Sequence, residues 1–318
     1  MACHLLQEQE ITPWKLGPMK NLAWGRLRPI LLAAFAAVAT NASAPTAEGA
    51  FNFRKLITID NTKVSGSADL IDFPVVVSLT DANLRTTANG GGVENASGFD
   101  MLFRGADGVT NLDHEVELYD PVAGTLVAWV RIPVLDYDDD TLFYLYYGDS
   151  TIVSSQENPT GVWDANYRAV WHLEESVTDE ATGAIHDDST VNNRDGTQSR
   201  NDDVPGKIAS AQDFDGTDHI NLGTGFPALG ATFTIEGWVW FDGFASFPTV
   251  FARQDNTLLD YRVVHDNGCG APGLRVDISY DGSEPGDAQG CPPAAVATGQ
   301  WYHFAAVKSA TELRMYLN

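Results

Sequence analysis

Residues 232–241 read Thr-Phe-Thr-Ile-Glu-Gly-Trp-Val-Trp-Phe, a short run of β-branched and aromatic residues. Such runs favour β-strands, because branched and aromatic side chains fit a pleated, half-buried surface. Similar runs recur from residue 53 to the end of the sequence, separated by Gly, Asn, Asp and Pro. No helical stretch of convincing length and amphipathicity interrupts them. The sequence therefore predicts an all-β protein.

The first group of strand-like runs predicts one β-sandwich domain over residues 51–150. An open sheet of such alternating strands would leave an apolar face in water, whereas two packed sheets bury it. Asp107-Gly108 is typical of a hairpin turn. The six predicted strands span residues 53–60, 73–79, 99–104, 114–119, 125–132 and 141–147.

A second group of runs predicts another β-sandwich domain over residues 168–318. Residues 151–167 begin with a polar stretch without periodicity, which predicts a junction between the domains. The last run, at residues 312–317, ends with the sequence. A sandwich that stops in mid-strand would expose an unpaired edge, so we expect this domain to be truncated at its C-terminus.

The first domain resembles a bacterial domain of unknown function that occurs in large exported proteins. The resemblance covers about residues 53–150, and its best-marked stretches lie at residues 53–60, 72–77, 112–117, 128–133 and 144–148. Residues 158–164 and 169–173 resemble the junction at which that family runs into a second domain.

The second domain is similar to a concanavalin A-like, LamG-type jelly roll. The similarity rests on Asp-Phe-Asp-Gly-Thr-Asp at 213–218, on residues 233–239 and on Gly-Gln-Trp-Tyr-His-Phe-Ala at 299–305. It implies recognition of a glycan or a surface protein, often with calcium. Similar domain pairs also head TolQ/ExbB-type proton-channel proteins and adhesins. A sensor or spacer ectodomain, linked to a membrane only through a missing C-terminal part, is therefore the alternative function.

The charge of the chain restricts its partners. Its 318 residues include 19 Lys and Arg against 43 Asp and Glu, so the net charge is −24. This excess of acid repels phosphate backbones and anionic lipid head groups, which excludes nucleic acid as a natural partner. Neutral or cationic partners fit better, and divalent cations are the simplest of them.

The N-terminal segment predicts a secretory signal over residues 1–44. Basic Lys20, Arg26 and Arg28 precede an apolar run at residues 30–39 that is too short to cross a bilayer, and small residues follow it. Cleavage is expected after Ala44 or Ala42, and Met19 is a possible true start. The expected location is secreted or in the cell envelope.

Two cysteines, Cys269 and Cys291, remain beyond the predicted signal. An even pair in an oxidising compartment predicts a disulfide that closes a Gly, Pro and Asp-rich excursion. A zinc site would need more cysteine or histidine nearby, and the spacing of His265 fits none.

Asp113, Glu115 and Glu117 form the first candidate site. Residues two apart in a strand share a face, so the three carboxylates should project together. Calcium or a row of basic residues from a neighbouring strand would neutralise them. Catalysis as in retaining glycosidases, where two carboxylates lie about 5–5.5 Å apart, is a less favoured hypothesis. A glycoside hydrolase is therefore the less favoured functional alternative.

Asp213, Asp215 and Asp218 form the second candidate site. With Gly216 the loop could fold around calcium, yet Asp-Gly-Thr-Asp is equally an ordinary hairpin turn. Phe244 and Phe247 are candidate sugar-stacking residues, whereas Trp171, Trp238 and Trp301 are expected in the core. No motif of a known catalytic class is recognisable. The sequence predicts a non-catalytic, calcium-stabilised recognition module.

Overall fold

In the computed structural model the chain folds into two compact units of β-structure. The structure describes residues 2–6, 51–224, 226, 229, 230, 232–244, 248–254, 259–266, 273–278, 288–292 and 295–318. The first unit contains residues 51–164, and the second contains residues 165–318 together with strand β1 (Ala2–Leu6). The division falls between Asp164 and Ala165, so residues 151–164 of the segment predicted as a junction belong to the first unit.

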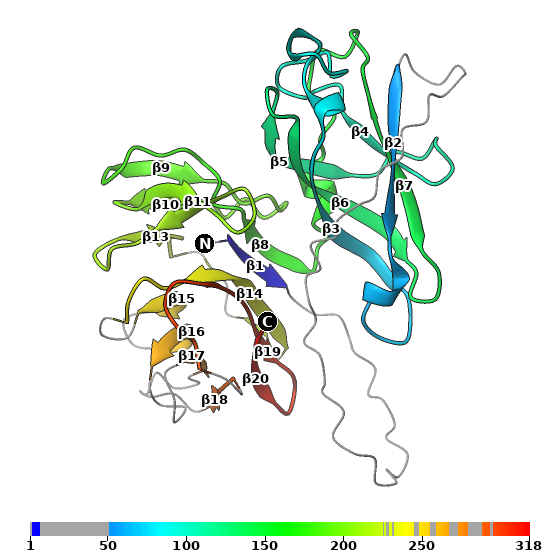
Figure 1. Ribbon diagram of the computed structural model, residues 1–318. Helices are drawn as coiled ribbons and strands as arrows, with labels where there is room; N and C mark the ends of the chain where they lie inside the picture. The colour runs from blue at the N-terminus through cyan, green and yellow to red at the C-terminus, as the bar shows by residue number, and fades with distance from the viewer. Residues whose placement is uncertain are drawn as a thin grey trace. The chain divides into compact units, whose positions relative to one another are not determined.

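The first unit is a sandwich of two antiparallel three-stranded sheets (Figure 1). One sheet has the order β2-β7-β4 and the other β3-β6-β5. Their bounds are β2 (Phe53–Ile59), β7 (Thr141–Tyr147) and β4 (Leu102–Gly105), and β3 (Leu70–Thr80), β6 (Thr125–Leu135) and β5 (His114–Asp120). This confirms the predicted sandwich.

The core of the first unit lies between these two sheets. Side chains alternate along β2, where Ile57 and Ile59 are buried and the intervening Thr58 is partly exposed. They pack with Phe103, Phe143 and the inward residues of the facing sheet. Strand alternation thus decides which side chains face the core and which face outward.

One charged residue occupies a core-facing position of this unit. Lys55 alternates with Ile57 and Ile59 on β2 and is 1% exposed. Its Nζ donates to Asp81 Oδ2 at 2.6 Å. Asp81 also caps the short helix η2 (Ala82–Leu84) by accepting from the Asn83 backbone N–H. The ion pair therefore joins β2 to the loop that follows β3.

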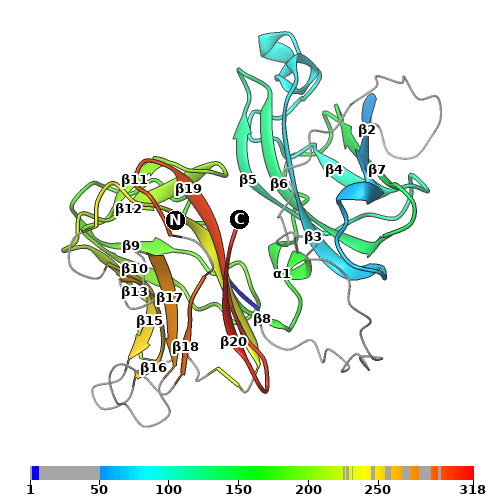
Figure 2. The same cartoon turned by 60° about the horizontal axis from the view of Figure 1, so that its bottom comes forward.

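Short helices complete the first unit. These are η1 (Asn61–Lys63), η2, η3 (Thr87–Asn89) and α1 (Pro159–Val162). The last of them begins with Pro159, which has no N–H to leave unsatisfied at a helix start. It contacts β5 and β6 (Figure 2), so the chain covers part of that sheet before it enters the second unit.

The second unit is built on two larger antiparallel sheets. The first has the order β20-β19-β14-β1-β8, with β8 (Tyr167–Trp171), β14 (Phe233–Trp240), β19 (Trp301–Lys308) and β20 (Leu313–Leu317). The second has the order β15-β16-β17-β18, with β15 (Thr249–Gln254), β16 (Leu259–Asp266), β17 (Gly273–Ile278) and β18 (Ala288–Gly290).

The core of the second unit contains Trp171, Ile235, Phe304 and Val276, which come from both sheets. The expectation that Trp171 is a core residue is confirmed. The same expectation is wrong for Trp238 and Trp301, which lie outside this core. Both occupy the strand positions that alternate with the buried residues, and therefore face outward.

Two smaller sheets extend the second unit. They are formed by β9 (Thr182–His186), β10 (Gly196–Ser199) and β13 (His219–Asn221), and by β11 (Asp202–Pro205) and β12 (Ser210–Asp213). Strands β9, β10 and β11 were not predicted. Their sequences are short and mostly polar, with few β-branched residues and none of the aromatic residues that mark the other strands.

A buried polar network fills the interior between these small sheets. Fully buried His186 lies with Nδ1 2.8 Å from Glu175 Oε2 and Nε2 3.1 Å from Asn201 Nδ2. Asn201 in turn donates to Gln212. Burial by itself would raise the pKa of Glu175, but the His186 hydrogen bond and the Asp187 N–H hold it below its usual value. Hydrogen bonding here replaces apolar packing.

Strand β1 lies within the segment that the sequence predicts as a signal peptide. Its backbone pairs on one side with β14, where Cys3 aligns with Gly237, and on the other with β8, where Cys3 aligns with Trp171. It therefore separates β8 from β14 in the sheet. The signal peptide itself stays a prediction.

Candidate functional sites

The carboxylate of Glu115 on β5 is engaged with an indole. Trp163, which follows α1, donates from Nε1 to Glu115 Oε2 at 2.7 Å. Glu115 is 8% exposed and Trp163 is 1% exposed. The end of the first unit thus lies over this part of β5, and its indole supplies the donor that a buried carboxylate requires.

Glu117 is engaged in the same way two residues further along β5. Trp129 on β6 donates from Nε1 to Glu117 Oε2 at 2.7 Å. The two indoles pack on each other with ring centroids 5.2 Å apart and planes tilted by 56°. The result is a double carboxylate–indole pair, which we call the Glu–Trp cluster (Glu115, Glu117, Trp129 and Trp163).

The third carboxylate of this strand, Asp113, accepts a hydrogen bond from Asn158 Nδ2 at 2.8 Å. Arg131 nearby donates to the Gly161 carbonyl and forms an ion pair with Asp72 at 3.0 Å. Asp113 and Glu115 thus meet residues 158–163, whereas Glu117 meets Trp129 of β6. The sequence predicts cations for these carboxylates. It gives no sign of the two tryptophans, because Trp129 lies on β6 and Trp163 follows α1.

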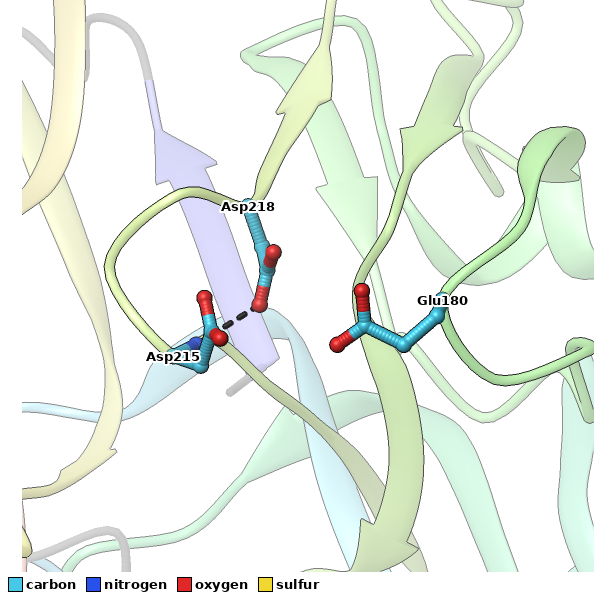
Figure 3. A group of neighbouring side chains, drawn as sticks. All are labelled: Glu180, Asp215 and Asp218. Carbon is cyan, nitrogen blue, oxygen red and sulfur yellow. Dashed lines mark hydrogen bonds between the residues drawn. The ribbon is translucent and has the colours of Figure 1, made fainter.

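The loop between β12 and β13 contributes to a cluster of three carboxylates (Figure 3). Glu180, Asp215 and Asp218 each offer an oxygen, and these three oxygens lie within 4.8 Å of one another. Two of them belong to the loop predicted to bind calcium, and Glu180 was not predicted. Strand pairing brings Glu180 close, which local spacing in the sequence cannot reveal.

The loop is also a well-formed turn. The Asp215 N–H donates to Asp218 Oδ2 at 2.6 Å, and Thr217 donates from its N–H and hydroxyl to Asp215 Oδ1. The Thr217 N–H is the main cause that lowers the pKa of Asp215. Gly216 has a φ of 103°, a conformation that glycine adopts without strain. The loop is thus a turn, but it joins strands of two different sheets, because β12 pairs with β11 and β13 pairs with β10. It is therefore not the hairpin turn that the sequence offers as an alternative.

A basic residue balances part of the charge of this cluster. Arg200 NH2 lies 2.6 Å from Glu180 Oε2, and Arg200 Nε lies 3.8 Å from Asp218 Oδ1. Asp213, by contrast, lies on β12 outside the group of three, and its backbone pairs with Asp202 of β11. The predicted trio is thus replaced by Glu180, Asp215 and Asp218.

Phe244 is 40% exposed, but its ring is already stacked. Its centroid lies 4.0 Å from that of His265, and the planes differ by 3°. One face of Phe244 is therefore covered by an imidazole. Phe247 and Cys269 lie outside the described residues, so the Phe247 platform and the Cys269–Cys291 disulfide stay predictions.

Aromatic side chains gather on the outer face of the sheet that contains β14 and β19. Trp240 is 41% exposed and aligns with Trp301, and their ring centroids lie 5.8 Å apart. Trp238 aligns with His303 in the next row, at 5.2 Å between centroids. Tyr316 of β20 is 40% exposed. We call Trp238, Trp240, Trp301 and Tyr316 the aromatic face.

Polar groups accompany the aromatic face. Trp240 donates to Asp242 at 2.7 Å, and Lys207 Nζ lies 5.4 Å from the centroid of the Trp238 ring. Glu236 lies 3.8 Å from His303. Burial raises the pKa of Glu236 to about 7 and lowers that of His303 to about 4, so both groups tend towards their neutral forms near neutral pH.

The fold and these surfaces define a β-protein of two sandwich units with aromatic and acidic surface groups in the second unit. Residues 214–318 match the family described as the concanavalin A-like lectin/glucanases superfamily. Residues 97–198 match the family described as a domain of unknown function, DUF2341. The chain thus carries a DUF2341 domain followed by a concanavalin A-like domain, as the sequence predicts.

No curated protein and no solved structure gave a significant match to the chain. Each family match covers less than half of the chain, and the DUF2341 match extends past the boundary between the two units. Within the part of the chain that the structure describes, no helix is long and apolar enough to cross a membrane.

Proposed function

We propose that this protein is a non-catalytic recognition protein that binds carbohydrate or protein at the cell surface, outside the cytoplasm. The concanavalin A-like domain fits a carbohydrate- or protein-binding extracellular module. The observation that carries the proposal is the aromatic face. Large, partly exposed rings beside hydrogen-bonding groups suit a ligand with both apolar and polar surfaces, such as a sugar ring.

The state of the Glu–Trp cluster supports a non-catalytic role. Glu115 and Glu117 are buried and each accepts an indole N–H. A glycosidase needs one carboxylate to attack and another to protonate across an accessible linkage. Here both carboxylates hold elements of the first unit together, and the recognition surface lies on the second unit.

Binding at the aromatic face is tested by replacing Trp240 with Ala. We expect the full chain to bind a subset of glycans on an array of microbial polysaccharides, and Trp240→Ala to weaken that binding about 5- to 140-fold. Loss of a stacking ring removes about 1–3 kcal/mol, and 1.4 kcal/mol corresponds to a factor of ten. Titration calorimetry with the best-bound glycan measures the change.

Val153 provides the matched control, because it is an exposed apolar residue of the first unit. Val153→Ala should bind as the wild type does. Equal binding by the wild type, Trp240→Ala and Val153→Ala would show that the aromatic face is not the binding site. No binding to any glycan or surface protein would refute the proposed function.

We also propose that Glu180, Asp215 and Asp218 bind calcium and stabilise the second unit. Calcium takes oxygen ligands at about 2.3–2.6 Å, so ligands on opposite sides of the ion lie up to about 5 Å apart. The 4.8 Å limit between the three oxygens is compatible with this geometry. Arg200 now neutralises part of the cluster, and calcium would compete with its guanidinium.

Calcium at saturating concentration is expected to raise the unfolding midpoint of the second unit by about 5–11 °C relative to chelator. A native-state ligand at 100 times its Kd contributes about 2.7 kcal/mol, and each kcal/mol shifts Tm by about 2–4 °C in a domain of this size. Differential scanning calorimetry measures the shift.

Two variants sharpen the calcium test. Asp215→Asn with Asp218→Asn should abolish the shift, because two ligand charges are lost. Arg200→Ala should instead increase calcium affinity, because the competing guanidinium is removed. A midpoint that is the same in calcium and chelator for the wild type would exclude this site.

A further inference from the structure

Figure 1 shows the sheet β2-β7-β4 of the first unit. The outer face of this sheet carries arginine and tyrosine side by side. Arg54 of β2 aligns with Tyr146 of β7, and Arg104 of β4 aligns with Tyr144 of β7. Residues directly opposite in a ladder share a face. All four therefore lie on one face, and the alternating Phe143 and Leu145 fill the core behind them. We call these four residues the Arg/Tyr stripe.

Each arginine contacts the ring of the tyrosine with which it is not aligned in the ladder. The Arg54 guanidinium carbon lies 4.8 Å from the centroid of the Tyr144 ring, in the neighbouring row. The Arg104 guanidinium carbon lies 4.9 Å from the Tyr146 ring and 5.5 Å from Phe51. All three distances fit cation–π contacts. The contacts hold both guanidinium groups against the sheet in defined positions.

Among the described residues Arg54 has no carboxylate partner. Its NH1 lies 3.4 Å from the Tyr146 hydroxyl, and its Nε is buried without a hydrogen-bond partner in the described part of the chain. Arg104 donates to the Asn111 side chain at 3.1 Å and to the Gly108 carbonyl at 3.3 Å. Two permanent positive charges thus lie on one face.

The carboxylate of Asp107, in the adjacent turn, accepts hydrogen bonds from residues of that turn. Asp107 accepts from the Thr110 hydroxyl at 2.6 Å and from the Val109 and Thr110 N–H groups at 2.9 Å. These bonds, with the hydroxyl first, lower the pKa of Asp107 to about 2. The stripe is therefore a local positive site in a chain with 43 acidic and 19 basic residues.

The complementary ligand carries a carboxylate beside an apolar ring face. Guanidinium groups bind carboxylates through paired hydrogen bonds, and the tyrosine rings offer flat apolar surface. A polyphosphate is disfavoured, because its dense charge meets the repulsion of a chain of net charge −24. A polymer that carries isolated carboxylates between neutral units has a lower charge density, so the negative chain repels it less.

We propose that the Arg/Tyr stripe is a binding site for an acidic glycan in which uronic acid residues alternate with neutral sugars. Arg54 and Arg104 bind the uronate, and Tyr144 and Tyr146 contact the sugar rings. This inference rests on the proposed function only for the class of ligand. The Arg/Tyr stripe lies on the first unit, and it shares no residue with the aromatic face of the second unit.

The test uses the full chain and a hexasaccharide of alternating glucuronic acid and N-acetylglucosamine, compared with its methyl ester. We expect the acidic hexasaccharide to bind at least tenfold more tightly than the ester in titration calorimetry. Arg54→Gln and Arg104→Gln should each weaken binding about tenfold. Lys63→Gln, which removes one charge from exposed Lys63 of the same unit, should not. Unchanged unfolding midpoints establish that the variants fold.

Five outcomes overturn the inference. Equal affinity for acid and ester shows that the carboxylate is not recognised, and equal loss in Arg54→Gln and Lys63→Gln shows that the stripe is not the site. Binding of an acidic peptide or a DNA oligonucleotide through Arg54, without binding of the hexasaccharide, assigns another ligand class. Binding of array glycans that depends on Trp240 alone rejects the stripe and leaves the proposed function standing, whereas absence of all glycan and surface-protein binding rejects both.

Discussion

Trp163→Ala should destabilise the first unit by about 4 kcal/mol. Burial of a tryptophan that is 1% exposed contributes strongly, and truncation of a buried Trp costs about 3–5 kcal/mol. The variant also leaves the buried Glu115 carboxylate without its indole donor, and an orphaned buried acceptor carries its own penalty. Urea unfolding of the full chain, followed by circular dichroism, measures the change.

Two companion variants separate packing from hydrogen bonding. Trp163→Phe keeps an aromatic ring and loses the N–H, so it should cost less, about 1–3 kcal/mol. Glu115→Gln keeps an acceptor oxygen for the indole. It should therefore reduce the free energy of unfolding less than Trp163→Ala or Trp163→Phe does. If Trp163→Ala unfolds like the wild type, residues 158–163 do not stabilise the first unit.

Asp81→Asn should destabilise the first unit by about 3 kcal/mol at pH 7. It leaves the ammonium of Lys55, which is 1% exposed, without a charged partner. Loss of one member of a buried pair costs about 3–5 kcal/mol, and the lower end applies because Asp81 is 26% exposed. Lys55→Met replaces the buried ammonium with an apolar side chain of similar length and should cost less than Asp81→Asn.

The same pair predicts how acid acts on the first unit. Burial by itself would raise the pKa of Asp81, but the Lys55 hydrogen bond and the Asn83 N–H lower it overall. A carboxyl whose pKa is lowered by folding contributes stability above its unfolded pKa, and that contribution is lost as pH falls through the folded pKa. The difference between wild type and Asp81→Asn should therefore shrink below about pH 4. Urea titrations at pH 7 and pH 3 test this, and a constant difference would contradict it.

The fold was predictable where strands carry β-branched and aromatic side chains. β7 and β14 match their predicted ranges within a residue or two. β10 and β11 were missed, because GTQS and DDVP give no such signal. Their stability depends on long-range hydrogen bonds through Asn201 and Gln212, which no local pattern reveals.

The candidate sites were predictable only in part, because each depends on residues distant in sequence. Asp215 and Asp218 were found from their loop, but Glu180 joins them only through the fold. The alternation of Glu115 and Glu117 was recognised, whereas the Trp163 that engages one of them comes from beyond the next two strands. Periodicity places a residue on a face, and tertiary structure decides what covers that face.

The placement of β1 has a consequence for export. If processing removes Ala2–Leu6, the facing backbones of β8 and β14 lose the hydrogen-bond partners that β1 gives them. A gap one strand wide would open in the middle of the sheet, with N–H and C=O groups on both sides. The exported protein would then need a replacement strand, antiparallel to both neighbours, to close the sheet.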